Sequence, residues 1–153
     1  LAAYDAMRAE EGARLARDLR ARLQSVGGAT LEIEREARGL PEAYAGRLGA
    51  RGAVLLKEPG LEPARLAQEV ALLADRLDIT EEVVRLKGHV DQARAALERP
   101  HGAIGKTLDF LMQEMNREAN TIASKAEEVA ICQASLRIKS EVEKMREQIQ
   151  NLE

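Results

Sequence analysis

The chain has 153 residues and a formal net charge of −3, with 32% charged but only 2% aromatic residues. Its Leu, Ala, Arg and Glu content favours long packed helices and argues against a core of aromatic rings. The charge balance excludes an overall polycation of the kind that binds nucleic acid without sequence preference. No apolar run approaches the roughly 20 residues that span a bilayer, so we expect no membrane partner. A single cysteine, Cys132, excludes an internal disulfide and fits the cytoplasm.

Helical periodicity begins at the start of the chain. Apolar residues recur at spacings of three, four and eight over residues 2–26 and predict one helix there. Gly27 and Gly28 should end it, since glycine weakens a helix interior more than any residue except proline. A second helix should follow, and Pro41 should kink or break it. We therefore expect residues 1–60 to form a long helical hairpin.

Three further helices are predicted over residues 61–77, 81–97 and 103–125, separated by short stops that contain proline or helix-capping residues. No segment carries the alternation of a strand. The sequence thus predicts an all-α fold of elongated antiparallel helical hairpins or a bundle. In this division, residues 61–153 form the second unit.

The last stretch of the chain carries a heptad seam. Its apolar residues are spaced by seven, four, three, four and three, and Ser135 fills a small intermediate position. This pattern predicts a long C-terminal helix that packs on a partner helix. The seam residues are Ile131, Ile138, Val142, Met145, Ile149 and Leu152.

The helix over residues 103–125 combines an apolar stripe with an unusual polar set. The stripe consists of Leu108, Leu111, Met112, Met115, Ala119 and Ile122. Asn116 and Asn120 lie between these residues, although asparagine is disfavoured within helices because its side chain competes for the backbone. A role beyond helix formation is therefore expected for this polar set.

Two groups of polar residues should converge if the helices before and after Pro100 are antiparallel. Arg85 and His89 share one helix face at i and i+4, and Glu114 and Glu118 do the same on the next helix. His89 lies 11 residues before position 100, at the centre of the turn, and residues 111–114 lie 11 to 14 after it. We therefore expect His89 to be level with Glu114.

One imidazole and two carboxylates at one level suit Mn²⁺ or Mg²⁺, and a histidine near neutrality can also act as a general acid or base. Simpler interpretations are that His89 makes a structural hydrogen bond beside Asp91 and that Glu114 and Glu118 form surface ion pairs. Spacing by itself favours a helical interaction domain.

Residues 108–126 read LDFLMQEMNREANTIASKA, and this stretch resembles the signature of the YicC/YloC family of bacterial endoribonucleases. The similarity is most specific over residues 66–126 and 145–153, and it is looser before residue 61. Gly88 stands where the family often has serine, and Ala93 stands where an aromatic residue is common. Family members also carry an N-terminal domain that nothing here resembles, so we expect this chain to be a C-terminal fragment.

The resemblance implies a cytoplasmic, divalent-metal-dependent endoribonuclease that assembles as a ring-like hexamer and takes part in small-RNA turnover. Carried onto this chain, it makes His89, Glu114 and Glu118 the candidate catalytic residues and metal ligands. Five further residues are candidates for RNA binding: Arg85, Arg117, Lys125, Asn116 and Asn120.

The alternative is a non-catalytic helical oligomerisation module that adapts RNA to a partner nuclease. A metal site requires His89, Glu114 and Glu118 within ligand reach, whereas an adaptor predicts that these groups are paired to arginines or dispersed. A third interpretation, an interhelical hydrogen-bond network that only sets the fold, requires Asn116 and Asn120 to be buried and paired.

Overall fold

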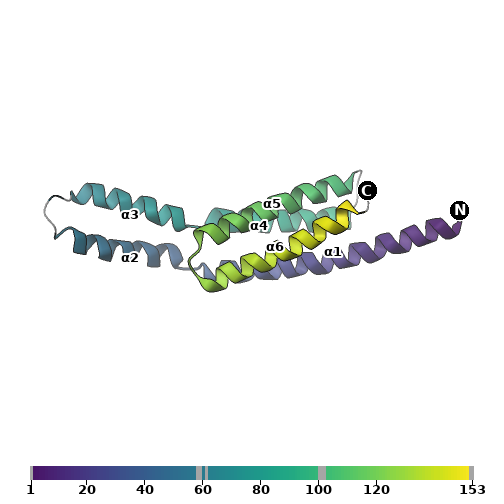
Figure 1. The fold of residues 1–153 in the computed structure, drawn as a ribbon, viewed down its shortest axis with the longest axis horizontal. Helices are drawn as coiled ribbons and strands as arrows, with labels where there is room; N and C mark the ends of the chain where they lie inside the picture. Colours follow the sequence, from purple (N-terminus) through teal and green to yellow (C-terminus); the bar gives the residue numbers. More distant parts are fainter. Residues whose placement is uncertain (1, 58–59, 61, 100–102, 152–153) are drawn as a thin grey trace.

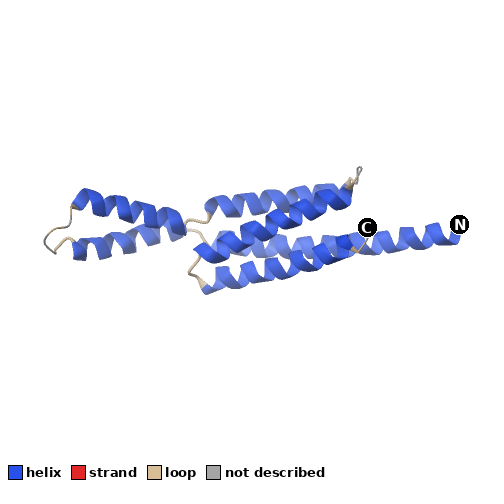
Figure 2. Ribbon diagram, turned by 45° about the horizontal axis from the view of Figure 1, so that its top comes forward, coloured by secondary structure: helices blue, strands red, loops and turns tan. Residues whose placement is uncertain are grey.

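The computed structural model describes residues 2–57, 60, 62–99 and 103–151, and every regular element among them is a helix. The predicted all-α, elongated architecture is confirmed (Figures 1 and 2). The helices are α1 (Ala2–Glu36), α2 (Leu40–Leu55), α3 (Pro63–Leu77), α4 (Thr80–Glu98), α5 (Ile104–Lys125) and α6 (Val129–Gln150).

Four helices form a bundle and two form an arm. In the bundle, α1 packs against α4 and α6, and α5 packs against the same two helices from the opposite side. The α2–α3 pair projects from one end of this bundle as a separate hairpin (Figure 1). At the other end, α1 extends beyond α6, where Tyr4 and Met7 are exposed.

The expected hairpin of residues 1–60 is not the pairing that forms. Four large apolar residues of α1 are buried against the bundle: Leu19, Leu23, Val26 and Ile33. In contrast, α2 is rich in alanine and glycine and buries only Tyr44 and Gly52. Because α2 cannot cover the stripe of α1, α1 pairs with α4 and α6 and α2 pairs with α3.

The prediction that Gly27 and Gly28 end the first helix is also wrong, because α1 continues through them to Glu36. A Cβ atom on Gly27 would lie 2.5 Å from Nη2 of Arg94 in α4. Gly27 thus lies in the interior of α1 beside the end of the Arg94 side chain, and it does not break the helix.

The break expected at Pro41 is confirmed. Helix α1 ends at Glu36, and Gly39 then adopts a φ of 75°, a left-handed conformation that glycine reaches without strain. Helix α2 begins directly afterwards, with Pro41 in its first turn. This turn directs α2 away from the bundle, and the hydroxyl of Tyr44 donates a hydrogen bond to Glu128 that ties the arm back to the α5–α6 turn.

The core follows the two apolar patterns of the sequence. All six stripe residues of α5 are buried. The seam residues of α6 from Ile131 to Ile149 are buried too, and Ser135 satisfies its hydroxyl by donating to the carbonyl of Ile131. Leu152, the last predicted seam residue, lies outside the described residues. The seam thus packs against α1 and α5 of the same chain.

Among the helices that the structure describes, none is both long and apolar enough to cross a membrane.

Candidate functional site

Helices α4 and α5 lie side by side and run antiparallel, which brings the predicted polar residues together. One nitrogen of His89 and one carboxylate oxygen each of Glu114 and Glu118 lie within 4.8 Å of one another. His89 is therefore level with Glu114, as the symmetry of the two helices about their connection predicts. We call His89, Glu114 and Glu118 the HEE cluster.

The imidazole of His89 lacks a hydrogen-bonding partner. Both Nδ1 and Nε2 are buried atoms without a partner among the described residues. Asp91, which was expected as a structural partner, instead lies 3.5 Å from Nη1 of Arg94. The simple structural interpretation of His89 is thus wrong. Because buried polar groups are normally satisfied, two vacant nitrogens beside two carboxylates indicate a place for a ligand.

Glu118 is the most buried member of the HEE cluster, with 4% of its surface exposed. Its Oε1 accepts a hydrogen bond from Nε of Arg85 at 2.8 Å, and the same guanidinium lies 3.1 Å from Glu81 and 3.6 Å from Glu82. The hydrogen bond with Glu118 raises the pKa of Arg85 above its usual value. Arg85 is thus a permanent cation at the edge of the cluster.

A second ion pair joins α4 and α5 near the end of α5. The Nζ atom of Lys125 lies 2.7 Å from Oε1 of Glu82 and donates to the carbonyl of Asp78 at 3.2 Å. Glu82 is 4% exposed, and its Oε2 has no partner among the described residues. Lys125 therefore links the end of α5 to the start of α4, two helical turns from His89.

The other candidate residues make fewer or weaker polar contacts. Arg117 is exposed and lies 3.9 Å from Glu114, a loose ion pair. Asn120 is exposed and Asn116 is half-buried, and the side chains of both lack hydrogen bonds to the described residues. The interpretation of the motif as a buried amide network is wrong for this reason. Sequence reasoning did not single out Glu81, although its i, i+4 spacing from Arg85 was a usable signal.

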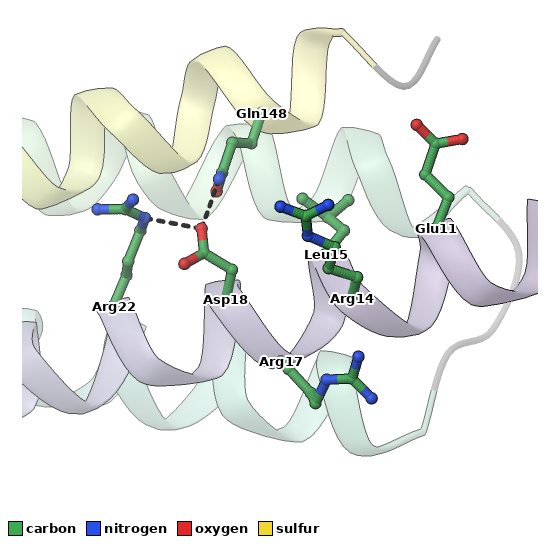
Figure 3. Close-up of a pocket in the computed structure, with 7 residues that line it drawn as sticks. All are labelled: Glu11, Arg14, Leu15, Arg17, Asp18, Arg22 and Gln148. Carbon is green, nitrogen blue, oxygen red and sulfur yellow. Dashed lines mark hydrogen bonds and ion pairs between the residues drawn. The ribbon is translucent and has the colours of Figure 1, made fainter.

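A cavity of about 710 Å³ lies away from the HEE cluster, between α1 and α6 (Figure 3). Asp18 accepts hydrogen bonds there from Gln148 and from Arg22, and these two bonds lower the pKa of Asp18. Arg22 also lies 3.0 Å from Glu141 on α6. Asp18, Arg22 and Glu141 are thus paired with one another. We interpret the cavity as an open junction between α1 and α6 that these ion pairs hold together.

The donor set of the HEE cluster fits a divalent cation of intermediate hardness. Imidazole nitrogen suits transition metals, and carboxylate oxygen suits Mg²⁺ and Mn²⁺. Both nitrogens of His89 are buried without a partner among the described residues, so one of them is available to a ligand. The residues present therefore fit the metal that the sequence resemblance implies.

The fold and the cluster define an all-α protein with a candidate metal centre between α4 and α5, beside Arg85 and Arg117. Residues 33–153 match the family described as endoribonuclease YicC-like, C-terminal, so the chain belongs to the YicC-like family. This membership confirms the resemblance of the sequence signature.

Two relatives extend the match beyond the family region. The chain is 45% identical over 148 residues to "Probable endoribonuclease YicC" of Clostridioides difficile (strain 630), which covers 96% of this chain and 50% of that relative. It is 39% identical over 150 residues to "Probable endoribonuclease YicC" of Haemophilus influenzae (strain ATCC 51907 / DSM 11121 / KW20 / Rd), covering 98% and 51%. The chain thus spans about half the length of these relatives.

Proposed function

We propose that the chain is the helical part of a metal-dependent endoribonuclease, with Mn²⁺ or Mg²⁺ held by the HEE cluster. One observation carries the proposal: His89, Glu114 and Glu118 converge to within 4.8 Å. Membership of the YicC-like family supports the reaction class, because the relatives carry the name of probable endoribonucleases. A divalent ion bound there would polarise the phosphodiester and lower the pKa of a bound water.

The protein groups have separate roles in this proposal. Arg85 binds Oε1 of Glu118, which leaves the second carboxylate oxygen for a ligand. The Arg85 guanidinium is 46% exposed and so remains accessible to a phosphate, whose geometry it matches. Arg117, on the exposed side of α5, contacts a neighbouring phosphate.

The remaining candidates lie on α5, on either side of Glu118. Asn116 and Asn120 have free amides that can bind sugar or base edges of the RNA. Lys125 is paired with Glu82, so its contribution is to fix the α4–α5 register and to balance the charge of the Glu82 carboxylate. The proposed RNA-binding residues thus lie on either side of the HEE cluster.

The test is cleavage of a labelled hairpin RNA by the full-length protein in Mn²⁺ and in EDTA. Glu114→Gln/Glu118→Gln should abolish metal-dependent cleavage, because it removes both carboxylates and retains side-chain size. The matched control is Glu143→Gln/Glu147→Gln, which changes two exposed glutamates at the same i, i+4 spacing on α6. Full activity of the first variant would refute the proposal.

A second candidate function, the non-catalytic RNA adaptor, is favoured by one observation. Two members of the HEE cluster are paired with arginines, Glu118 with Arg85 and Glu114 loosely with Arg117. The heptad seam does not add to this case, because it is buried within the chain. RNA binding without cleavage by a folded full-length protein would support the adaptor and direct attention to a partner nuclease.

We extend the main proposal to the setting that the family resemblance implies. The full-length protein acts in the bacterial cytoplasm, takes part in small-RNA turnover and assembles as a hexamer. Mass photometry of the full-length protein tests the oligomer. Small-RNA levels in a strain that carries Glu114→Gln/Glu118→Gln test the cellular role.

A further inference from the structure

Phe110 is an aromatic side chain in an unexpected place. It is the only phenylalanine of the chain, and 58% of its surface is exposed. The apolar stripe of the same helix is buried, so α5 has a core-facing side that Phe110 does not share. Packing of the described chain therefore gives no reason for a large aromatic ring at this position.

The position of Phe110 relative to the HEE cluster is specific. Glu114 follows Phe110 at i+4, one helical turn or about 6 Å along the axis at 1.5 Å per residue. Gln113 and Arg117 follow at i+3 and i+7, and both are exposed. The ring, the amide and the guanidinium thus form one exposed stripe that runs past the cluster.

The chemistry of this stripe fits nucleic acid better than a protein surface. A protein partner is expected at a contiguous apolar patch, whereas Phe110 is followed by an amide and a cation. Proteins that bind single-stranded RNA combine such cations with aromatic rings on which unpaired bases stack. Asp109 accepts a hydrogen bond from Nε2 of Gln113 at 2.8 Å, which fixes the orientation of this amide on the same exposed side of α5.

We propose that Phe110 stacks on an unpaired nucleobase next to the phosphodiester held at the HEE cluster. The inference rests on the proposed function and narrows its substrate class to RNA that is single-stranded at the cleaved bond. A paired base offers its face to its neighbours in the helix and cannot stack on Phe110 as well. Single-stranded segments and loops should therefore be preferred over continuous duplex.

The test measures binding and stacking without cleavage. The full-length protein is mixed in EDTA with a short single-stranded RNA that carries 2-aminopurine, whose fluorescence is quenched by stacking. We compare Phe110→Ala, Phe110→Leu and Phe110→Trp, because leucine keeps apolar surface without a ring and tryptophan keeps a ring. The control is Leu136→Ala on α6, where the original side chain is 60% exposed.

Alanine and leucine at position 110 should weaken RNA binding by about fivefold or more and remove protein-induced quenching, as expected for the loss of one base–aromatic contact. Tryptophan at position 110, and Leu136→Ala, should stay within about twofold of the unchanged protein in affinity. Affinity for continuous duplex RNA should not change in any variant.

Two results would overturn the inference. One is single-strand binding and quenching by Phe110→Leu equal to those of the unchanged protein. The other is a change in oligomer mass for Phe110→Ala with unaltered RNA affinity, which would assign the ring to a protein contact. Cleavage in Mn²⁺ is assayed in parallel, so a failure of the nuclease proposal is seen separately from a failure of stacking.

Discussion

Replacing His89 with leucine should stabilise the metal-free chain while abolishing its response to Mn²⁺. Both ring nitrogens of His89 are buried and have no partner in the described part of the chain. A buried polar group without a hydrogen bond costs about 1–3 kcal/mol, and leucine removes both groups with little change in size. At ~2–4 °C per kcal/mol for a chain of this length, the melting temperature should rise by about 2–12 °C.

Mn²⁺ should stabilise the unchanged chain and should not stabilise the His89→Leu variant. A ligand present at about 100 times its Kd stabilises the folded state by ~2.7 kcal/mol, which is about 5–11 °C on the same scale. His89→Leu should lose this shift, because it removes one of the three groups that lie within 4.8 Å. Such a pairing of lower stability with a functional site is common in proteins.

The assay is thermal unfolding followed by circular dichroism, in EDTA and over a series of Mn²⁺ concentrations. Gln92→Leu is the control, because Gln92 is exposed on the same helix, one turn from His89. The reasoning is refuted by a lower melting temperature for His89→Leu in EDTA together with a Mn²⁺ shift equal to that of the unchanged chain.

Three further predictions concern stability, each measured by urea denaturation. Gly28→Ala should stabilise the chain by ~0.5–1 kcal/mol, since an added Cβ meets no atom within 4 Å; a loss of stability would contradict this. Burial and the hydrogen bond to Glu128 raise the pKa of Tyr44 from 10 to about 12, so the unfolded chain loses its proton first as pH rises. The contribution of Tyr44 to the free energy of unfolding should therefore be complete below pH 10 and decrease by ~2–3 kcal/mol towards pH 12. The Tyr44→Phe variant should not show this decrease. Met115→Ala should cost ~2–5 kcal/mol because its side chain is fully buried, whereas Phe110→Ala should change stability by less than about 0.5 kcal/mol.

The helices themselves were predictable from the sequence, because periodicity is a local property of the chain. The α5 stripe and the α6 seam are buried where their spacing places them. The level of His89 with Glu114 was predictable for the same reason, since equal rise per residue in two antiparallel helices fixes their register about the connection.

Helix pairing was not predictable in the same way. An apolar stripe predicts that one face of a helix is buried, but it does not predict which helix packs against that face. The alanine-rich α2 leaves α1 to pair with α4 and α6. Gly27 shows the same limit, because its neighbour Arg94 is 67 positions away along the chain and reaches it only in the folded bundle.

The residues of the candidate site were predictable from the sequence. The hydrogen-bond and ion-pair partners of these residues were decided by the tertiary structure. The spacing of His89, Glu114 and Glu118 on two helices was sufficient to predict that they meet. Whether each polar atom finds a partner depends on side chains from both helices at once. Only the folded α4–α5 pair therefore gives Glu118 its bond to Arg85 and leaves both nitrogens of His89 vacant.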